Sequence, residues 1–470
     1  MVSGTGICVK GFGWTHAGRA EPALRDVTFH VEPGERILLC GDSGSGKSTL
    51  LAALAGVLGG DEEGEQVGEI RLFRAGAASN GEWPGEGMPV GLVLQDPDSQ
   101  VISSRVGDDV AFGCENLGLE RSEIWRRVDQ ALELVGLDLP RDYPTARLSG
   151  GQKQRLALAG VMAMGAGLIL LDEPTANLDP EGADSVVRAV TQLVERTGAT
   201  LIVVEHQPDR WRHLLQRGLL IEDGQVALDA SMGEVLEARA QAMPTLPQAR
   251  VPQEVSSLEP AMWSQDLATR FGPPRTFELP TGASTVVTGP NGAGKTTWLE
   301  TMAGLLPYTS GEVGVAEHVR RGLKGAPAAW KSRELAHRIG YVFQNPEHQF
   351  VARSVADELR VGPRVMGEEV PEKRIAELVE RLRLGQLLGA NPFTLSGGEK
   401  RRLSVATALV SAPAVLLLDE PTFGQDPQTF AELVWMLREL SDEGVTIASV
   451  THDPLFIAAL GDHRVEVPRA

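Results

Sequence analysis

The feature that most constrains this chain is an internal repeat of long motifs. Gly-Asp-Ser-Gly-Ser-Gly-Lys-Ser-Thr (41–49) returns as Gly-Pro-Asn-Gly-Ala-Gly-Lys-Thr-Thr (289–297). Leu-Leu-Asp-Glu-Pro-Thr occurs twice, and Leu-Ser-Gly-Gly-Gln returns as Leu-Ser-Gly-Gly-Glu. Five such pairs follow one order at offsets of 246 to 249 residues, for example from Lys47 to Lys295. One domain therefore occurs twice in the chain.

The length of the chain agrees with two domains, because 470 residues are more than a domain with a single hydrophobic core usually contains. We expect the first domain over 1–236 and the second over 261–470. The segment 237–260 contains four prolines and little helical periodicity, so it is predicted to be a linker. Extended, it would reach about 70 Å, which lets the two domains meet as an intramolecular pair.

Composition and charge argue against several classes of protein: disordered, disulfide-rich, zinc-binding and nucleic-acid-binding proteins. A hydrophobic content of 42% with 23% charged residues is typical of a globular protein. The three cysteines, without a CxxC pair, provide no disulfide framework and no zinc signature, and we expect them to be small buried hydrophobes. A net charge of −19 argues against binding to nucleic acid or to an anionic membrane surface. A membrane role would therefore require a protein partner.

Direct membrane insertion is not expected. The longest apolar runs, 156–171 and 403–418, have sixteen residues each, and about 18 or more are needed to span a bilayer. Each run ends in Asp-Glu-Pro-Thr and is interpreted as a helix, a loop and a buried strand. The N-terminal residues show no basic stretch followed by an apolar one, so no signal peptide is expected.

The motif at 41–49 predicts a phosphate-binding loop. It follows the apolar run Ile-Leu-Leu-Cys and precedes a helix-like segment, and strand, GxxxxGK[ST] and helix is the P-loop arrangement. Glycines let backbone N–H groups surround phosphates at a helix N-terminus. Lys47 would supply a positive charge to the β- and γ-phosphates, and Ser48 a hydroxyl ligand for Mg²⁺. Lys295 and Thr296 repeat the pair.

Two adjacent carboxylates end an apolar strand in each copy. Asp172 and Glu173 follow one loop lysine, and Asp419 and Glu420 follow the other, at spacings of 125 and 124 residues. Ligands of open α/β sheets bind at the carboxyl ends of strands. The aspartates are therefore candidates for holding Mg²⁺, and the glutamates for polarising the attacking water.

Leu-Ser-Gly-Gly-Gln/Glu upstream of Leu-Leu-Asp-Glu-Pro-Thr resembles the signature of ABC-type ATPases, and the resemblance covers nearly the whole chain. It implies an α/β fold with two tandem P-loop domains, each with a mostly parallel sheet, an antiparallel β region and a helical signature subdomain. It also implies two composite sites for Mg-ATP, in which the signature of one domain closes on nucleotide held by the other. Lys47 would pair with Ser396 and Gly398, and Lys295 with Ser149 and Gly151.

The same resemblance assigns further positions. Gln95 and Gln344 match the Q-loop glutamine, which touches Mg²⁺ and senses the transport partner, and His206 and His452 match the switch histidine. Asp179 and Asp426 fit the D-loop, although the second D-loop departs from the first in sequence. Trp14 is the candidate for stacking on adenine in the first domain. In the second domain Phe271 is the best candidate, and a role in the hydrophobic core is the alternative for it.

These considerations give one set of candidate residues. The catalytic candidates are Glu173, Glu420, His206 and His452. The ATP-binding candidates are Trp14, Gly41, Ser43, Gly44, Gly46, Lys47, Ser48, Thr49, Gln95, Ser149, Gly151, Gln152, Gly289, Asn291, Gly292, Gly294, Lys295, Thr296, Thr297, Gln344, Ser396, Gly398 and Glu399. The Mg²⁺ candidates are Ser48, Gln95, Asp172, Thr296, Gln344 and Asp419.

The residues after each Q-loop narrow the family. Gln-Asp-Pro-Asp-Ser-Gln (95–100) and Gln-Asn-Pro-Glu-His-Gln (344–349) share Q-x-P-x-x-Q. This resembles the ATPases of energy-coupling-factor (ECF) importers of vitamins and transition metals. The resemblance implies a peripheral protein on the cytoplasmic side of the cell membrane, bound to an integral T-component that carries a substrate-capturing S-component.

Two alternatives remain open. The chain could be the fused ATPase of a sugar or peptide importer, although sugar-type fusions commonly lose one catalytic glutamate and both are present here. It could also be a double-cassette factor acting on the ribosome, against which the short linker and the net charge of −19 argue. Because both copies keep their Lys, Asp, Glu and His, both sites are expected to hydrolyse ATP.

Overall fold

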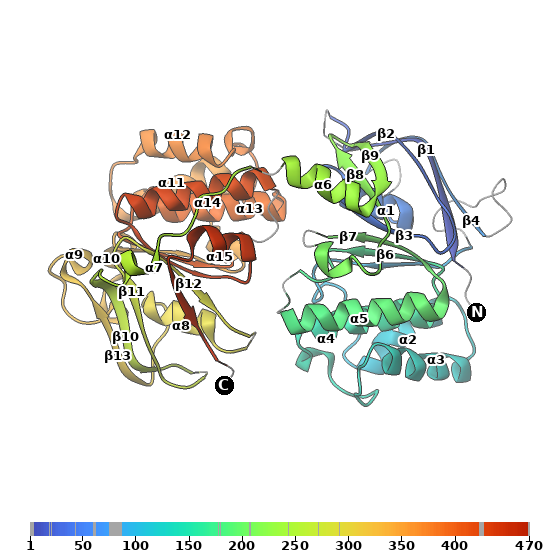
Figure 1. Ribbon diagram of the computed structural model, residues 1–470, viewed down its shortest axis with the longest axis horizontal. Helices are drawn as coiled ribbons and strands as arrows, with labels where there is room; N and C mark the ends of the chain where they lie inside the picture. Colours follow the sequence, from blue (N-terminus) through green and yellow to red (C-terminus); the bar gives the residue numbers. More distant parts are fainter. Residues whose placement is uncertain are drawn as a thin grey trace. The chain divides into compact units, whose positions relative to one another are not determined.

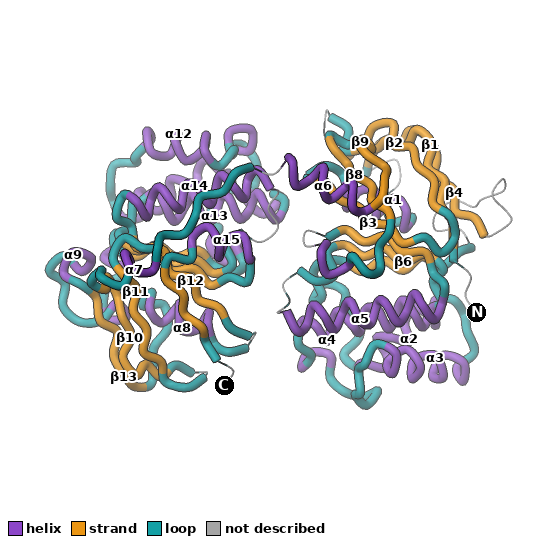
Figure 2. The backbone as a smooth tube through the Cα atoms, viewed as in Figure 1, coloured by secondary structure: helices purple, strands orange, loops and turns teal. Residues whose placement is uncertain are grey.

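The computed structural model describes residues 4–17, 19, 21–42, 44–59, 63–74, 87–176, 178, 180–205, 208–242, 244–270, 272–290, 292–422 and 427–468. The chain divides into two compact units, Met1–Ala242 and Met243–Ala470 (Figure 1). Each unit contains a mostly parallel sheet, a three-stranded antiparallel sheet and a group of helices (Figure 2). The predicted α/β fold class is therefore confirmed.

The central sheet of the first unit has six strands in the order β5-β6-β7-β3-β8-β9, parallel except for the β8–β9 pair. Its strands are continuous apolar runs because both faces are covered. In β6, for example, Leu168 and Leu170 enter one core, whereas Ile169 and Leu171 enter the other. The strands are β3 (Arg36–Gly41), β5 (Val90–Val93), β6 (Leu168–Asp172), β7 (Thr200–Val204), β8 (Arg217–Glu222) and β9 (Gln225–Ser231).

Different elements cover the two faces of this sheet. Helix α1 and the antiparallel sheet β2-β1-β4 pack on one face, and helices α2 to α5 pack on the other (Figure 1). The bounds are β1 (Thr5–His16), β2 (Leu24–Val31), β4 (Gly64–Arg74), α1 (Lys47–Ala55), α2 (Val106–Asn116), α3 (Arg121–Leu134), α4 (Gly150–Met164), α5 (Pro180–Thr197) and α6 (Met232–Ala242), with short 3₁₀ turns at Thr145–Arg147 and Pro208–Trp211.

The second unit repeats the plan with a five-stranded parallel sheet in the order β14-β15-β16-β12-β17. The strands are β12 (Ser284–Thr288), β14 (Ile339–Val342), β15 (Val415–Asp419), β16 (Thr446–Val450) and β17 (His463–Glu466), and the antiparallel sheet β11-β10-β13 comprises β10 (Pro260–Ala268), β11 (Arg275–Pro280) and β13 (Ser310–Val315). The helices are α7 (Pro252–Val255), α8 (Lys295–Met302), α9 (Glu317–Arg320), α10 (Ser332–Ala336), α11 (Val355–Met366), α12 (Glu372–Arg381), α13 (Gly397–Val410), α14 (Pro427–Asp442) and α15 (Pro454–Leu460). Short 3₁₀ turns lie at η3 (Pro327–Ala329), η4 (Pro346–Gln349), η5 (Gly385–Leu387) and η6 (Pro392–Thr394).

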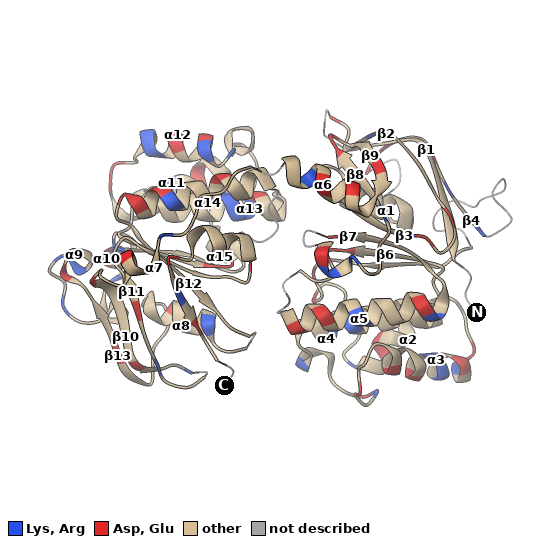
Figure 3. Cartoon of the chain, viewed as in Figure 1, with Lys and Arg blue, Asp and Glu red and all other residues tan. Residues whose placement is uncertain are grey.

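The two long apolar runs form helix, loop and strand, as predicted. Residues 156–171 cover the end of α4 and most of β6, and residues 403–418 cover the end of α13 and most of β15. Within the described ranges, no helix combines the length and the apolar character that crossing a bilayer requires. Charged residues are frequent along the outer helices, whereas the central strands contain few (Figure 3).

The segment predicted as the linker has structure of its own. Helix α6 extends to Ala242, and from Thr245 onward the chain is bound to the second unit. The indole N–H of Trp435 donates to the carbonyl of Thr245 at 2.8 Å. The N–H of Arg250 donates to Asp462 at 2.7 Å, and its guanidinium donates to the carbonyl of Gly282 at 2.7 Å.

Candidate functional site

The phosphate-loop motif joins a strand to a helix in both units. Strand β3 ends at Gly41 and helix α1 begins at Lys47, and β12 and α8 repeat this arrangement. A Cβ on Gly41 would lie 2.1 Å from the carbonyl oxygen of Ile221, and one on Gly289 would lie 2.3 Å from that of Val467. Only glycine fits where each loop leaves its sheet.

The loop lysines are folded over their loops. The Nζ of Lys47 donates to the carbonyls of Gly41 at 3.0 Å and Asp42 at 2.6 Å. The Nζ of Lys295 donates to the matching carbonyls of Gly289 and Pro290, at 2.7 and 3.0 Å. Each lysine is only 7% exposed. Burial lowers the pKa of Lys47, and the nearby carboxylates of Glu173 and Asp172 oppose that shift.

The paired carboxylates stand on matching turns. Asp172 ends β6 and Asp419 ends β15, and the glutamate that follows each has a φ of 48°. Such a left-handed conformation costs a non-glycine residue about 1–3 kcal/mol and occurs often at functional sites. The N–H of Glu173 donates to Val204, and that of Glu420 donates to Val450, both at 2.9 Å. In each unit, a hydrogen bond to the neighbouring strand, β7 or β16, thus holds the backbone of the glutamate in place.

In the first unit, the structure brings two predicted residues together. Gln95 lies just beyond β5, and its Nε2 donates to the Oε2 of Glu173 at 2.6 Å. The Q-loop glutamine and the candidate base are therefore in direct contact although 78 residues separate them.

In the second unit, the predicted metal ligands meet. The hydroxyl of Thr296 donates to the Oδ2 of Asp419 at 2.7 Å. Burial raises the pKa of Asp419, and this hydrogen bond opposes the shift. Burial, followed by the charge of Asp419, raises the pKa of Glu420 to about 7. Glu420 also has a hydrogen bond with Thr451, which directly precedes His452. The switch segment therefore lies beside the candidate base.

The donor set fits magnesium. Hydroxyl, carboxylate and amide oxygens are hard ligands of the kind that Mg²⁺ takes together with phosphate oxygens and water. The structure places Thr296 against Asp419, and Ser48 occupies the matching place in the first turn of α1. Thr49 lies next to Ser48, and its hydroxyl is 3.4 Å from the Nε2 of His16. Thr297 follows Thr296 in α8.

The signature motifs form the starts of α4 and α13. Ser149 and Gln152 make a capping box, in which the N–H of Ser149 donates to the Gln152 side chain at 2.9 Å. Ser396 and Glu399 make the same box at 2.8 Å. These side chains therefore have a structural role in starting their helices.

Gly151 and Gly397 of the signature motifs are not required by packing within their own units. A Cβ on Gly151 would make only ordinary contacts, at 3.7 Å from the side chain of Leu178 and 3.8 Å from Gly182. A Cβ on Gly397 would meet no described atom within 4 Å, and Gly398 is buried in the first turn of α13. A requirement for glycine at Gly151 would therefore come from something outside the unit, such as bound phosphate.

The structure does not fit Trp14 as an adenine platform. Its side chain is 3% exposed and belongs to the core between α1 and the antiparallel sheet. Its indole N–H donates to the Nδ1 of His16 at 3.1 Å. A ring packed in a core offers no face to a base. His16, which is half-buried and reaches Thr49, is the aromatic side chain nearer the loop, and its position two residues along the same strand was an available signal.

One further carboxylate near the first site was not predicted from the sequence. Glu205 follows β7, is buried, and accepts hydrogen bonds from the Thr175 hydroxyl at 2.5 Å and the Trp211 indole at 3.3 Å. It connects the chain before His206 with the residues after Glu173. The second unit has Thr451 at this place, so the two sites differ here.

Several predicted residues lie outside the described ranges. They are Ser43, Asp179, His206, Phe271, Asn291 and Asp426.

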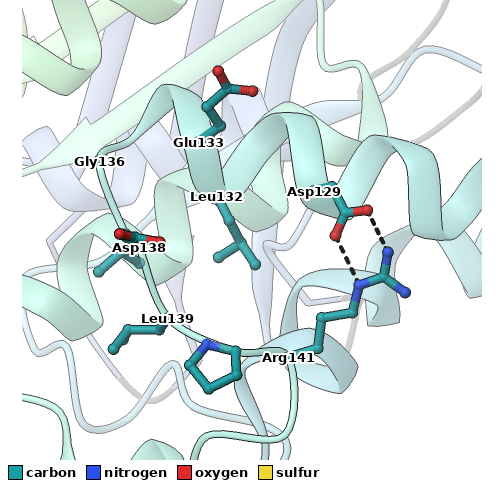
Figure 4. Close-up of a pocket in the computed structure, with 9 residues that line it drawn as sticks. Asp129, Leu132, Glu133, Gly136, Asp138, Leu139 and Arg141 are labelled. Carbon is teal, nitrogen blue, oxygen red and sulfur yellow. Dashed lines mark hydrogen bonds and ion pairs between the residues drawn. The ribbon is translucent and has the colours of Figure 1, made fainter.

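A surface pocket of about 430 Å³ lies away from these sites. It is formed by the end of α3 and the loop that follows, and the guanidinium of Arg141 points to the carboxylate of Asp129 at one side of it (Figure 4). None of its lining residues is among the candidates above, so this pocket is not part of the predicted ATP sites.

Comparisons with known proteins agree with the repeat. The model of the ABC transporter family matches residues 24–176 and 274–423. The Bacillus subtilis protein YkoD, an ATP-binding protein provisionally assigned to HMP/thiamine import, is 33% identical over 97% of this chain and 88% of its own length. An ABC transporter ATP-binding protein of Saccharolobus solfataricus, also provisionally assigned, is 31% identical over 96% of this chain and 89% of its own length.

The solved structures of similar fold include ribosome-associated proteins. The archaeal ribosome recycling factor aABCE1 matches 98% of this chain and 87% of its own chain with a TM-score of 0.64. Its sequence identity of 20% shows a shared fold alone.

Proposed function

The chain belongs to the ABC transporter family, whose model matches it twice, and we propose that both cassettes hydrolyse ATP and that the chain powers an ECF-type importer. The cargo would be a vitamin, a vitamin precursor or a transition metal, carried by membrane partner subunits. The observation that carries the proposal is the 33% identity to YkoD over nearly the whole of both chains. The Q-x-P-x-x-Q sequence after each Q-loop supports the ECF branch.

Each cassette would bind ATP through its own loop. The backbone N–H groups after Gly41 and Gly289 would surround the phosphates, and Lys47 and Lys295 would exchange their carbonyl partners for phosphate oxygens. The hydroxyls of Ser48 and Thr296, the carboxylates of Asp172 and Asp419, and the amides of Gln95 and Gln344 would hold Mg²⁺. Bound Mg²⁺ offsets the phosphate charge.

The chemistry would be shared between the glutamates and the histidines. Glu173 and Glu420 would accept a proton from the attacking water, and His206 and His452 would contact the γ-phosphate. The signature residues Ser149, Gly151, Ser396 and Gly398 would close each site from the opposite cassette. Closure would depend on ATP, and opening would follow hydrolysis.

Exposed apolar side chains near the Q-loops support a membrane partner. Leu94 and Ile102 flank the first Q-loop sequence, and Val351, which is 73% exposed, follows the second. Burying such side chains against a partner is favourable. The partner would be an integral T-like subunit carrying an S-like subunit, which would hold this chain at the cytoplasmic side of the cell membrane.

Affinity purification of the tagged full chain from detergent-solubilised native membranes, followed by mass spectrometry, tests the proposal. We expect one T-like and one S-like membrane protein in equal amounts. Val351→Asp should lower their recovery at least about ten-fold, because an apolar contact would then bury a charge. The matched control is Val251→Asp, at a 53% exposed position of the segment before α7.

If the membrane subunits of a sugar or peptide importer are recovered instead, the chain would be assigned to that importer and the ECF assignment would be wrong. Ribosomal proteins, or no membrane protein at all, would contradict the transport role and leave the two-site ATPase intact.

A further inference from the structure

A buried arginine joins three parts of the second cassette. Arg401 lies on α13 and is 3% exposed. Its Nη1 donates to the carbonyl of Phe343 at 2.6 Å, and its Nη2 donates to that of Gln344 at 2.5 Å. The same Nη1 lies 3.4 Å from the carbonyl oxygen of Asp419. One guanidinium therefore reaches the Q-loop and the end of β15 from the signature helix.

Burying the guanidinium of Arg401 costs free energy, which its hydrogen bonds and the nearby carboxylates offset. Burial lowers the pKa of Arg401 to about 10, and the charges of Glu420 and Asp419 oppose the shift. A buried charge is tolerated when it is hydrogen-bonded and lies near opposite charge. The forked guanidinium suits the two adjacent carbonyls of Phe343 and Gln344, which a single ammonium would match less well.

A second connection runs beside the first. Gln349, the last residue of the Q-x-P-x-x-Q sequence, donates from its Nε2 to the carbonyl of Ser404 at 3.1 Å and the hydroxyl of Thr407 at 2.9 Å. The Ser404 hydroxyl donates back to the Oε1 of Gln349 at 2.5 Å. Both partners lie on α13. The short turn η4 is thus fastened to the signature helix.

The first cassette is built differently at both positions. Gln154 stands where the second cassette has Arg401, and its amide makes a hydrogen bond of 3.2 Å to the carbonyl of Leu94. Gln100, the counterpart of Gln349, turns back on its own loop, with hydrogen bonds to Leu94 and Asp96. An ion pair between the lysine after the signature and an acid of the Q-loop is common to both cassettes.

We propose that Arg401 is a positioning residue that holds the Q-loop and the Asp419–Glu420 turn at a fixed distance from α13. A displacement of the second Q-loop is then passed to the carboxylates of its ATP site and to the signature helix together. The first cassette lacks this arginine: neutral Gln154 makes a single hydrogen bond to the carbonyl of Leu94, and the Q-loop contacts Glu173 through Gln95 instead. The proposal rests on ATP hydrolysis at the second site and does not depend on the identity of the membrane partner.

Arg401→Gln in the full chain tests the proposal, because it introduces the residue that the first cassette carries. We expect the kcat for ATP per chain to fall to half or less, since one of two sites is misaligned. The KM for ATP should change by less than about two-fold, because the loop that binds phosphate is untouched. The matched control is Arg402→Gln, whose guanidinium contacts Thr429 at 3.5 Å.

Hydrogen exchange of the backbone amides provides a readout that does not depend on turnover. Exchange in 343–351 should be at least about ten-fold faster in Arg401→Gln and unchanged in Arg402→Gln. Gln349→Ala, which removes a neutral side chain and leaves the buried charge in place, should raise exchange in the same segment. Unchanged exchange and kcat in both Arg401→Gln and Gln349→Ala would overturn the proposal. Faster exchange throughout the unit, with a lowered melting temperature, would reduce Arg401 to a structural role and overturn it as well.

Discussion

The side-chain amide of Gln95 donates a 2.6 Å hydrogen bond to the carboxylate of Glu173 in the first cassette. A movement of the Q-loop would therefore move the carboxylate that we propose as the general base. In the second cassette, Glu420 is bonded to Thr451, next to the switch histidine. The two candidate bases occupy equivalent turns with different side-chain partners.

Both glutamates should nevertheless be required for hydrolysis. Loss of a general base typically lowers the rate 10²–10⁴-fold, so we expect a fall of about 10² or more at the site that carries Glu173→Gln or Glu420→Gln. Single-turnover assays of each variant measure this. The amide is isosteric with the carboxylate, so the melting temperature serves as the control for folding. Full activity surviving in either variant would mean that its site is idle.

The signature glycines provide a test that separates function from folding. Gly151→Ala fits the first unit without a clash, so its free energy of unfolding should not fall. If the proposed closure occurs, ATP turnover at the one site that Gly151 completes should drop at least about ten-fold in a single-turnover assay, because the added methyl group would meet phosphate bound by the opposite cassette.

Gly160→Ala is the matched control for Gly151→Ala. It lies in the same helix, α4, and its Cβ would meet no described atom within 4 Å. It should keep full turnover and gain up to about 1 kcal/mol of stability. Equal turnover in the two variants would argue that nothing closes on the first signature.

The second cassette should lose stability in acid through one buried ion pair. Arg438 donates to both carboxylate oxygens of Asp462, each at 2.8 Å, and backbone N–H groups of Arg250 and Ser284 donate to the same carboxylate. Burial alone would raise the pKa of Asp462, but these hydrogen bonds lower it below its usual value. The stabilisation is therefore present above the unfolded pKa of about 3.9 and is lost as pH falls through the folded pKa.

Asp462→Asn should lower the free energy of unfolding at pH 7 by about 3–5 kcal/mol, the usual result of breaking a buried pair. Urea unfolding at several pH values measures the difference, which should shrink below about pH 4. Asp442→Asn, at a more exposed carboxylate that also contacts Arg438, should cost less than about 1 kcal/mol. A difference between wild type and Asp462→Asn that stays constant from pH 7 to pH 3 would contradict this account.

The burial of Trp14 predicts that its main role is structural. Trp14→Ala should destabilise the first unit by about 3–5 kcal/mol, as truncation of a core aromatic does. His16→Ala, at a half-buried position, should cost much less and should weaken ATP binding through its contact with Thr49. Urea unfolding and ATP titration of both variants distinguish the two roles. A native-like stability of Trp14→Ala with weakened ATP binding would restore the indole as the platform.

The sequence was sufficient for the features that repeat or that form a continuous apolar run. The twin motifs predicted two cassettes, and the apolar run 168–171 predicted a strand buried on both faces, because only a covered sheet excludes polar side chains from both sides. The carboxylates after that strand were correctly placed at its carboxyl end.

Other features depend on contacts that leave no pattern. Trp14 and His16 share one face of β1, so alternation could not tell which of the two rings is buried. The carbonyls bound by Arg401 belong to the backbone and are present at every residue, so the residue types in the sequence could not predict these hydrogen bonds. Part of the docking of residues 245–250 on the second unit likewise uses backbone groups, the N–H of Arg250 and the carbonyl of Thr245, in a segment without periodicity.

The number of ATP molecules held by one chain tests the central claim most directly. The full chain carrying both Glu173→Gln and Glu420→Gln would be incubated with Mg-ATP, separated from free nucleotide by gel filtration, and assayed for bound ATP. We predict two ATP per chain, falling to about one when Lys47→Ala or Lys295→Ala is added, because each loop lysine serves one site. One ATP or none in the chain that retains both lysines would contradict the account of two ATP sites.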